Sequence, residues 1–152
     1  MHIATITAFL DTLRTIGVNI YTTVFDGVLG RLLIAAGQPE AARERLDTAL
    51  ALAQDTGMRF YDAELLRLRA RTHDDPGARQ DDINVALELA RRQGATLFEL
   101  RVALDDFELR GEPASAALAD AADRIPADNA WPELGRARVV LAEPSQSGSS
   151  DD

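Results

Sequence analysis

The chain has 152 residues, 46% apolar and only 5% aromatic, a composition that predicts one folded domain and argues against disorder of the whole chain. It contains no cysteine, which excludes disulfides and thiolate metal sites. Its net charge of −9 argues against binding nucleic acid through the phosphate backbone, and no apolar run approaches the length of a membrane span. We therefore expect a cytoplasmic protein with neither nucleic acid nor membrane among its partners.

Apolar periodicity and helix-end residues predict eight helices. In chain order they are residues 3–15, 19–36, 39–55, 60–72, 77–92, 96–109, 113–124 and 132–142. Residues 144–152 are small and polar, so we expect a helical domain over 1–143 and a disordered tail over 144–152.

The first helix resembles the second half of a helix pair whose partner is missing. This arrangement would leave part of its apolar surface uncovered, namely the side chains of Ile3, Ile6, Phe9 and Leu10. An exposed apolar area of this size usually finds a partner. We therefore expect the helix at 3–14 to form a homodimer or to dock on another domain.

Three prolines, Pro39, Pro76 and Pro113, are spaced 37 residues apart, and each begins a stretch compatible with a helix. Glycines suited to left-handed helix ends precede two of these prolines. Apolar positions keep the same register, so that Leu46, Ala49 and Ala53 recur as Ile83, Ala86 and Ala90. Repetition at this period predicts an all-α solenoid of antiparallel helix pairs, in which each pair buries its apolar face on its neighbours.

Seven residues fall at the spacings of the tetratricopeptide signature: Leu29, Gly30, Leu33, Gly37, Ala42, Leu46 and Ala49. The stretches 57–70 (GMRFYDAELLRLRA) and 86–95 (ALELARRQGA) further resemble the C-terminal helical-repeat region of large bacterial regulators. In those proteins a class III nucleotide cyclase domain or a LuxR-type DNA-binding domain accompanies a nucleotide-binding ATPase module.

The resemblance covers roughly residues 8–143 and departs from the pattern at two places. Ala70 and Arg71 stand where the family usually has a small residue and a glutamate, and the aromatic-rich segment before the last helix is reduced to PADNAW. The cyclase, ATPase and DNA-binding domains would lie outside this chain. The resemblance therefore implies the tail of a signalling or transcriptional regulator and transfers no catalytic residue.

The candidate interaction residues lie on the first helices of the pairs and before the last helix. Arg67 and Arg71 are one turn apart and either pair with acidic neighbours on the helix surface or project into a concave groove to bind a carboxylate or phosphate. We expect the groove to include Tyr21, Phe25 and Leu104 as well. Trp131 is interpreted as a packing anchor for the last helix, with an exposed interface residue as the alternative.

The remaining polar clusters are interpreted structurally. His73 precedes Asp74 and Asp75, but adjacent carboxylates in a turn usually cap the next helix, and no second histidine stands at ligand spacing. The acidic pairs 81–82 and 105–106 are typical of a solvated face, because neighbouring helical residues point about 100° apart. We expect no catalytic residue, no metal and no cofactor.

Two functions remain open. The first is a protein-interaction module that binds a protein or peptide in its concave groove. The second is a ligand-sensing regulatory fragment of a cyclase- or LuxR-type regulator, which predicts a pocket with converging polar groups. An independent enzyme is the least favoured interpretation.

Overall fold

The computed structural model describes residues 2–17 and 21–142, and every regular element in these two ranges is helical. The elements are α1 (His2–Thr15), α2 (Thr22–Ala35), α3 (Pro39–Thr56), α4 (Asp62–Ala70), α5 (Pro76–Gln93), α6 (Thr96–Arg110), the 3-10 turn η1 (Glu112–Ala114), α7 (Ser115–Asp123) and α8 (Pro132–Ala142). The all-α prediction is confirmed. The expected tail at 144–152 lies outside the described residues, as does the expected helix start at residue 19.

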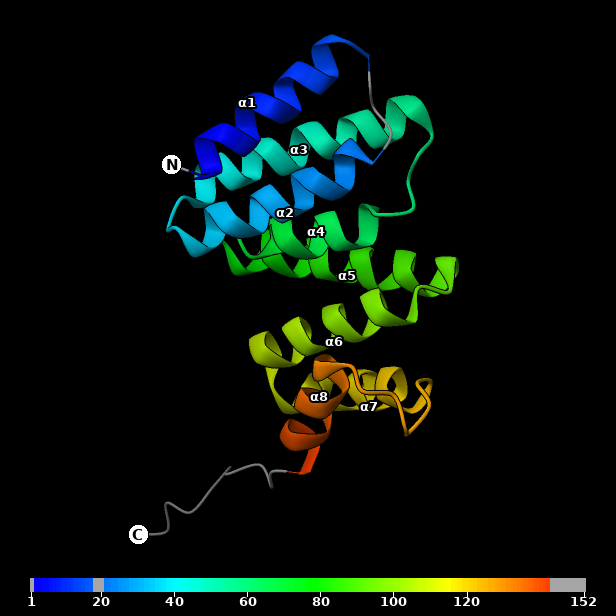
Figure 1. Ribbon diagram of the computed structural model, residues 1–152. Helices are drawn as coiled ribbons and strands as arrows, with labels where there is room; N and C mark the ends of the chain where they lie inside the picture. Colours follow the sequence, from blue (N-terminus) through cyan, green and yellow to red (C-terminus); the bar gives the residue numbers. More distant parts are fainter. Residues whose placement is uncertain (1, 18–20, 143–152) are drawn as a thin grey trace, which may run out of the picture.

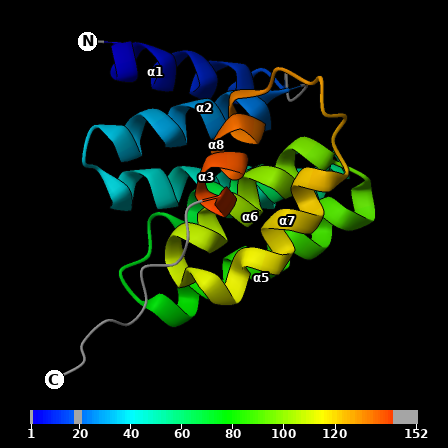
Figure 2. The same cartoon turned by 90° about the horizontal axis from the view of Figure 1, so that it is seen from below.

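The helices form a stack in which each helix contacts the next one along the chain. Figure 1 shows α1 at one end of this stack and α7 and α8 at the other. Figure 2 looks at the stack from below, so that α8 is drawn across α2 and α3. The even-numbered helices also contact one another in succession, α2 with α4, α4 with α6 and α6 with α8. One side of the stack is therefore built from these four helices.

Proline and glycine set the ends of the two longest helices. Pro39 and Pro76 occupy the first turn of α3 and α5, where a missing backbone donor costs nothing. Gly57 and Gly94 end the same helices with φ of +72° and +63°, a conformation that residues with a Cβ rarely adopt. These predicted boundaries follow from local chemistry, and the structure has them where the sequence indicates.

The third proline behaves differently. Pro113 lies inside η1, and α7 begins only at Ser115, although a helix was predicted from residue 113. The reason is a tight turn after α6, in which the backbone N–H of Ala114 donates to the carbonyl of Gly111 at 2.9 Å in the pattern of a 3-10 helix. The chain thus reverses direction before the α-helix starts.

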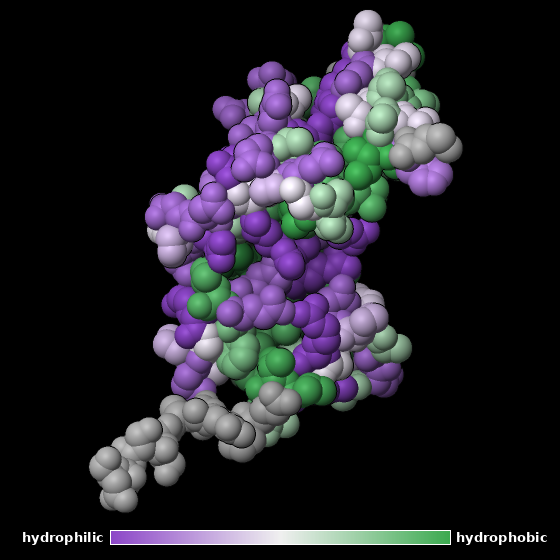
Figure 3. Space-filling view, turned by 90° about the vertical axis from the view of Figure 1, so that its left-hand side faces the viewer, coloured by the Kyte–Doolittle hydropathy of each residue, from purple (hydrophilic) through white to green (hydrophobic). Residues whose placement is uncertain are grey.

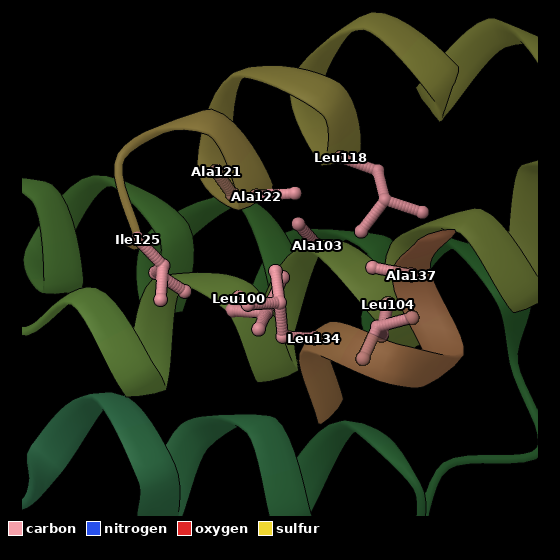
Figure 4. Packing of buried hydrophobic residues seen from close by; sticks show 9 residues of the cluster. All are labelled: Leu100, Ala103, Leu104, Leu118, Ala121, Ala122, Ile125, Leu134 and Ala137. Atoms are coloured by element: carbon pink, nitrogen blue, oxygen red, sulfur yellow. The ribbon is translucent and has the colours of Figure 1, made fainter. Parts of the chain in front are cut away.

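A large apolar cluster joins the last three helices. Leu100 and Leu104 of α6 face residues of α7 and α8, and the side chains converge in Figure 4. The partners from α7 and α8 are Leu118, Ala121, Ala122, Leu134 and Ala137. Most of these residues are leucine and alanine, so the helices approach closely, and Phe107 and Trp131 pack against the cluster from its margin.

Helix α1 is attached by both apolar and charged contacts. Leu10 is buried against Leu29 and Leu33 of α2, whereas Phe9 is largely exposed. The buried carboxylate of Asp26 accepts hydrogen bonds from Arg14 of α1 and, at 2.8 Å, from the Nε of Arg45 in α3. Burial raises the pKa of Asp26, although the two guanidinium groups act in the opposite direction.

Within the described ranges, none of the helices combines the length and apolarity that crossing a bilayer requires.

Candidate functional site

A polar hollow of about 160 Å³ lies on the side formed by the even-numbered helices. All four of these helices contribute to its walls: α2 supplies Arg31, α4 and its last turn supply Glu64, Arg67 and Arg71, α6 supplies Arg101, Leu104 and Asp105, and α8 supplies Glu133 and Arg136. Five arginines and three carboxylates thus meet at one place. In a chain of net charge −9, this is a local excess of positive charge.

Arg67 forms the floor of the hollow. Its Nε and Nη2 donate to the two oxygens of Glu64 at 2.8 and 2.9 Å, and its Nη1 donates to Asp105 at 2.6 Å. Burial lowers the pKa of Arg67, but the two carboxylates outweigh that effect and the net shift is upward. Arg67 therefore joins α4 to α6, and its Nε, Nη1 and Nη2 are each bound to a carboxylate.

Arg71 and Arg101 are less completely engaged. Half of the Arg71 side chain is exposed, and among the described residues its one ion pair is to Asp105 at 3.5 Å. Arg101 directs Nε and Nη2 to Glu133 at 2.8 Å, while its Nη1 lies 3.6 Å from Glu64. Both residues line the hollow, and each guanidinium has more N–H donors than these contacts use.

Glu133 fixes α8 against α6. Burial by itself raises the pKa of Glu133, but the backbone N–H of this residue and the Arg101 guanidinium favour the charged carboxylate more strongly. The net pKa lies below the ordinary value of 4.5. The carboxylate is therefore ionised at neutral pH and holds Arg101 in place.

An aromatic row runs along the starts of the even-numbered helices. Tyr21, Phe60, Tyr61 and Phe98 follow one another with ring centroids 6.2, 6.4 and 5.3 Å apart. The row depends on Gly27, because a Cβ there would lie 2.7 Å from the Cε1 of Tyr61. Burial raises the pKa of Tyr61, and the guanidinium groups of Arg101, Arg31 and Arg67 act on its hydroxyl in the opposite direction. Tyr61 is therefore the member of the row on which three arginines of the hollow act.

Part of this aromatic surface is open. Tyr21 is 60% exposed, Phe25 of α2 is 50% exposed and Phe60 is 47% exposed. We call these three residues the aromatic patch. Tyr21 is also the one non-glycine residue among those described with a positive φ, of 60°. Its left-handed backbone places the ring at the start of α2 rather than in the helix.

The two other predicted groove residues are placed differently. Leu104 lines the hollow but is buried in the cluster of α6, α7 and α8. Trp131 is half-buried and packs on that same cluster, which fits a packing anchor for α8. The predicted residues Tyr21, Phe25 and Arg71 are therefore the accessible members of the set.

A second hollow of about 360 Å³ adjoins the first and shares Arg71 and Asp105 with it. Its remaining walls are Ala70, Arg79, Ile83, Glu108 and Leu109. Figure 3 shows hydrophilic side chains gathered at the height of α4 to α6 on one face of the stack, with apolar residues towards the bottom of the view. Arg71 and Asp105 are thus common to an arginine-lined space and a partly apolar one.

The candidate metal ligands have other roles. Asp75 caps α5, since its carboxylate accepts the backbone N–H of Ala78 at 2.8 Å. The Nε2 of His73 lies 3.0 Å from Asp82, which also binds Arg69 through both oxygens. In the ranges 2–17 and 21–142, no three His, Cys, Asp or Glu residues are grouped so as to hold a metal ion.

Four residues of the hollow were not singled out from the sequence: Arg31, Arg101, Glu133 and Arg136. One signal was present, because Glu64 and Arg101 have opposite charges and stand one period of 37 residues apart. Equivalent positions on neighbouring pairs lie close together in a stack, so this opposition indicates a contact. No such signal exists for Arg31, since Leu68 stands one period later.

Comparisons with known proteins give limited information. No family model matches the chain, and no solved structure matches it. An uncharacterized protein of Rhizobium meliloti (strain 1021) is 33% identical over 96 residues, which cover 60% of this chain. The matched segment spans only 9% of the length of that protein.

Proposed function

We propose that the chain is a non-catalytic protein-interaction module whose binding face is formed by α2, α4, α6 and α8. The observation that carries this proposal is the hollow to which all four helices contribute, on the same helices that expose the aromatic patch. Exposed aromatic residues beside arginines are the side chains most enriched at the centres of protein interfaces.

The proposal includes a tetratricopeptide-like solenoid with a period of 37 residues. Supporting it, α3 and α5 each have 18 residues and each has a proline in its first turn. Each also ends at a left-handed glycine, Gly57 or Gly94, again 37 residues apart. Stacks of helix pairs use the surface along one helix of each pair to bind extended partners.

We place the module in a bacterial signalling or transcriptional regulator. The sequence resemblance to the C-terminal regions of such proteins supports this assignment. The similarity to a short segment of a far longer protein is consistent with it.

A ligand-sensing role is the second candidate, favoured by the size and charge of the arginine-lined hollow. A space of about 160 Å³ admits a small anion or one acidic side chain, whereas a whole nucleotide needs more. A thermal shift with small dianions but no protein partner would favour this second function.

Affinity capture with matched variants tests the interaction module. The immobilised chain, the variant Phe25→Asp and the variant Val85→Asp are incubated with native lysate. Val85 is also half exposed but lies on α5, an odd-numbered helix. The module predicts a protein that the wild type and Val85→Asp retain and that Phe25→Asp loses. Equal capture by all three proteins would contradict the proposed binding face.

A further inference from the structure

Arg31 differs from every other arginine of the chain. All 16 arginines fall within the described ranges; 14 of them donate to a carboxylate, a hydroxyl or a backbone carbonyl, and Arg71 forms an ion pair with Asp105. Arg31 has neither a hydrogen bond nor an ion pair with any residue that the structure describes, and its side chain is exposed at the wall of the hollow. A guanidinium has five N–H donors in a planar fork that matches a carboxylate, so Arg31 keeps its whole binding capacity.

The neighbours of Arg31 increase the positive potential at this place. Arg71 makes one long contact with Asp105, which Arg67 already binds at 2.6 Å. Arg136 forms an ion pair with Glu108, a residue of the adjoining hollow. Cations held close together repel one another, and an anion placed between them removes that repulsion. The hollow therefore favours a negatively charged guest.

The three carboxylates in the walls limit the charge of that guest. Glu64, Asp105 and Glu133 leave the five arginines with only a modest excess of positive charge. One singly charged carboxylate offsets part of this excess, and a guanidinium and a carboxylate pair through two parallel N–H bonds. The volume of about 160 Å³ is also that of a side chain rather than of a large headgroup.

The aromatic patch adds an apolar component beside the hollow. Tyr61 connects the two, because its ring neighbours Phe60 and packs on Gly27 of α2, which lies one turn before Arg31. A partner bound here places apolar side chains on Tyr21, Phe25 and Phe60 and an acidic side chain at Arg31 and Arg71. Aromatic side chains supply contact area at low entropic cost, while the arginines fix the position of the partner along the binding face.

We infer that this face binds an acidic segment of a partner protein, with a glutamate or aspartate carboxylate between Arg31 and Arg71 and neighbouring apolar side chains on the aromatic patch. The inference rests on the proposed function, since it specifies the chemistry of the partner at the same binding face. It also predicts that Arg31 and Arg71 are needed for partner binding, whereas the proposed interaction module does not specify which arginines contribute.

Fluorescence anisotropy with three labelled peptides tests this inference on the whole chain. The first peptide has twelve residues that alternate between glutamate and leucine, the second has glutamine in place of glutamate, and the third has phosphoserine there. We expect the glutamate peptide to bind at least about ten-fold more tightly than the glutamine peptide, and more tightly than the phosphoserine peptide. Arg31→Gln and Arg71→Gln should each weaken its binding about five- to ten-fold.

The control variant is Arg92→Gln on α5, whose exposed guanidinium pairs only with Glu88. It should bind the glutamate peptide as the wild type does. Equal affinity for the glutamine peptide, a preference for the phosphoserine peptide, or unchanged affinity of Arg31→Gln would each overturn the inference. If such a result appears while Phe25→Asp still abolishes capture of a protein partner, the interaction module stands and only the acidic chemistry is wrong.

Discussion

Arg67 and Glu64 form a buried, bidentate ion pair within one turn of α4, with N–O distances of 2.8 and 2.9 Å. Asp105 of α6 occupies the third face of the same guanidinium at 2.6 Å. The pair therefore belongs to the architecture of the stack, where it ties two even-numbered helices together beneath the hollow. Ligand binding is left to the arginines around it.

Replacing Arg67 by methionine should destabilise the fold strongly. The substitution leaves the buried carboxylates of Glu64 and Asp105 with only long contacts, to Arg101 at 3.6 Å and to Arg71 at 3.5 Å. Removing one partner of a buried ion pair costs about 3 to 5 kcal/mol. Urea unfolding measures the change in the free energy of unfolding. The exposed pair of Arg92 and Glu88 supplies the control, since Arg92→Met should cost less than about 1 kcal/mol. Similar losses for both variants would show that the buried pair is not a structural tie.

Gly30 should not tolerate a side chain. A Cβ there would lie 2.8 Å from Cδ2 and 3.0 Å from Cγ of Leu46, which is fully buried, so rotating the terminal methyl groups does not relieve the clash. We expect Gly30→Ala to lower the free energy of unfolding by about 1 to 2 kcal/mol, because overpacking exceeds the gain in helix propensity.

Gly135 is the matched control for Gly30, since it also lies inside a helix but has no heavy atom within 4 Å of an added Cβ. Gly135→Ala should stabilise the chain by up to about 1 kcal/mol through helix propensity alone. Thermal melts of the two variants should therefore move in opposite directions. A stabilised Gly30→Ala would refute the close approach of α2 and α3.

The contact between α6 and α8 should weaken in acid. The pKa of Glu133 is lower in the folded protein than its ordinary value of 4.5, so the unfolded chain takes up the proton first as pH falls. The stabilisation is complete above that value and is lost as pH drops through the folded pKa. The difference in unfolding free energy between wild type and Glu133→Gln should shrink between about pH 7 and about pH 3.

Trp131 is the only tryptophan and immediately precedes α8, so its fluorescence reports on this end of the stack. Comparing the variant with the wild type at each pH cancels contributions from other carboxylates. A difference that stays constant with pH would mean that Glu133 is not held ionised by Arg101.

Asp75 should act as a helix cap and not as a metal ligand. Its carboxylate accepts the backbone N–H of Ala78 at 2.8 Å, and the loss of such a cap costs about 1 kcal/mol. Asp75→Ala should show this loss in urea unfolding. Asp74→Ala, one residue earlier and exposed, should have little effect. Equal losses, or a loss that appears only when metal ions are added, would argue against the cap.

The parts of the fold that depend on local chemistry were predictable from the sequence. Pro39 and Pro76 begin helices, and Gly57 and Gly94 end them, because each residue acts on its own backbone. The start of α7 was predicted two residues early, at Pro113, since the 3-10 turn after Gly111 depends on a backbone hydrogen bond that no single residue type reveals.

The candidate site was predictable only in part for a related reason. Arg67 and Arg71 were identified as a pair on one helix face, but their different engagement arises from Asp105, 38 residues after Arg67. Arg31 was not predicted as a site residue, because it has no ion-pair partner among the described residues and the sequence around it shows no charge pattern that would indicate its role. Charge pairing between distant helices is a tertiary property and needs coordinates.

The most direct test of the proposed binding face is site-specific photo-crosslinking in the native host. A photoreactive phenylalanine analogue replaces Phe25 in one strain and Val85 in another. The two positions are comparably exposed, but one belongs to α2 and the other to α5. The account predicts a defined protein adduct at position 25 that is absent at position 85 and weakened by Arg31→Gln. An adduct of equal yield at position 85, or no adduct at position 25, would contradict it.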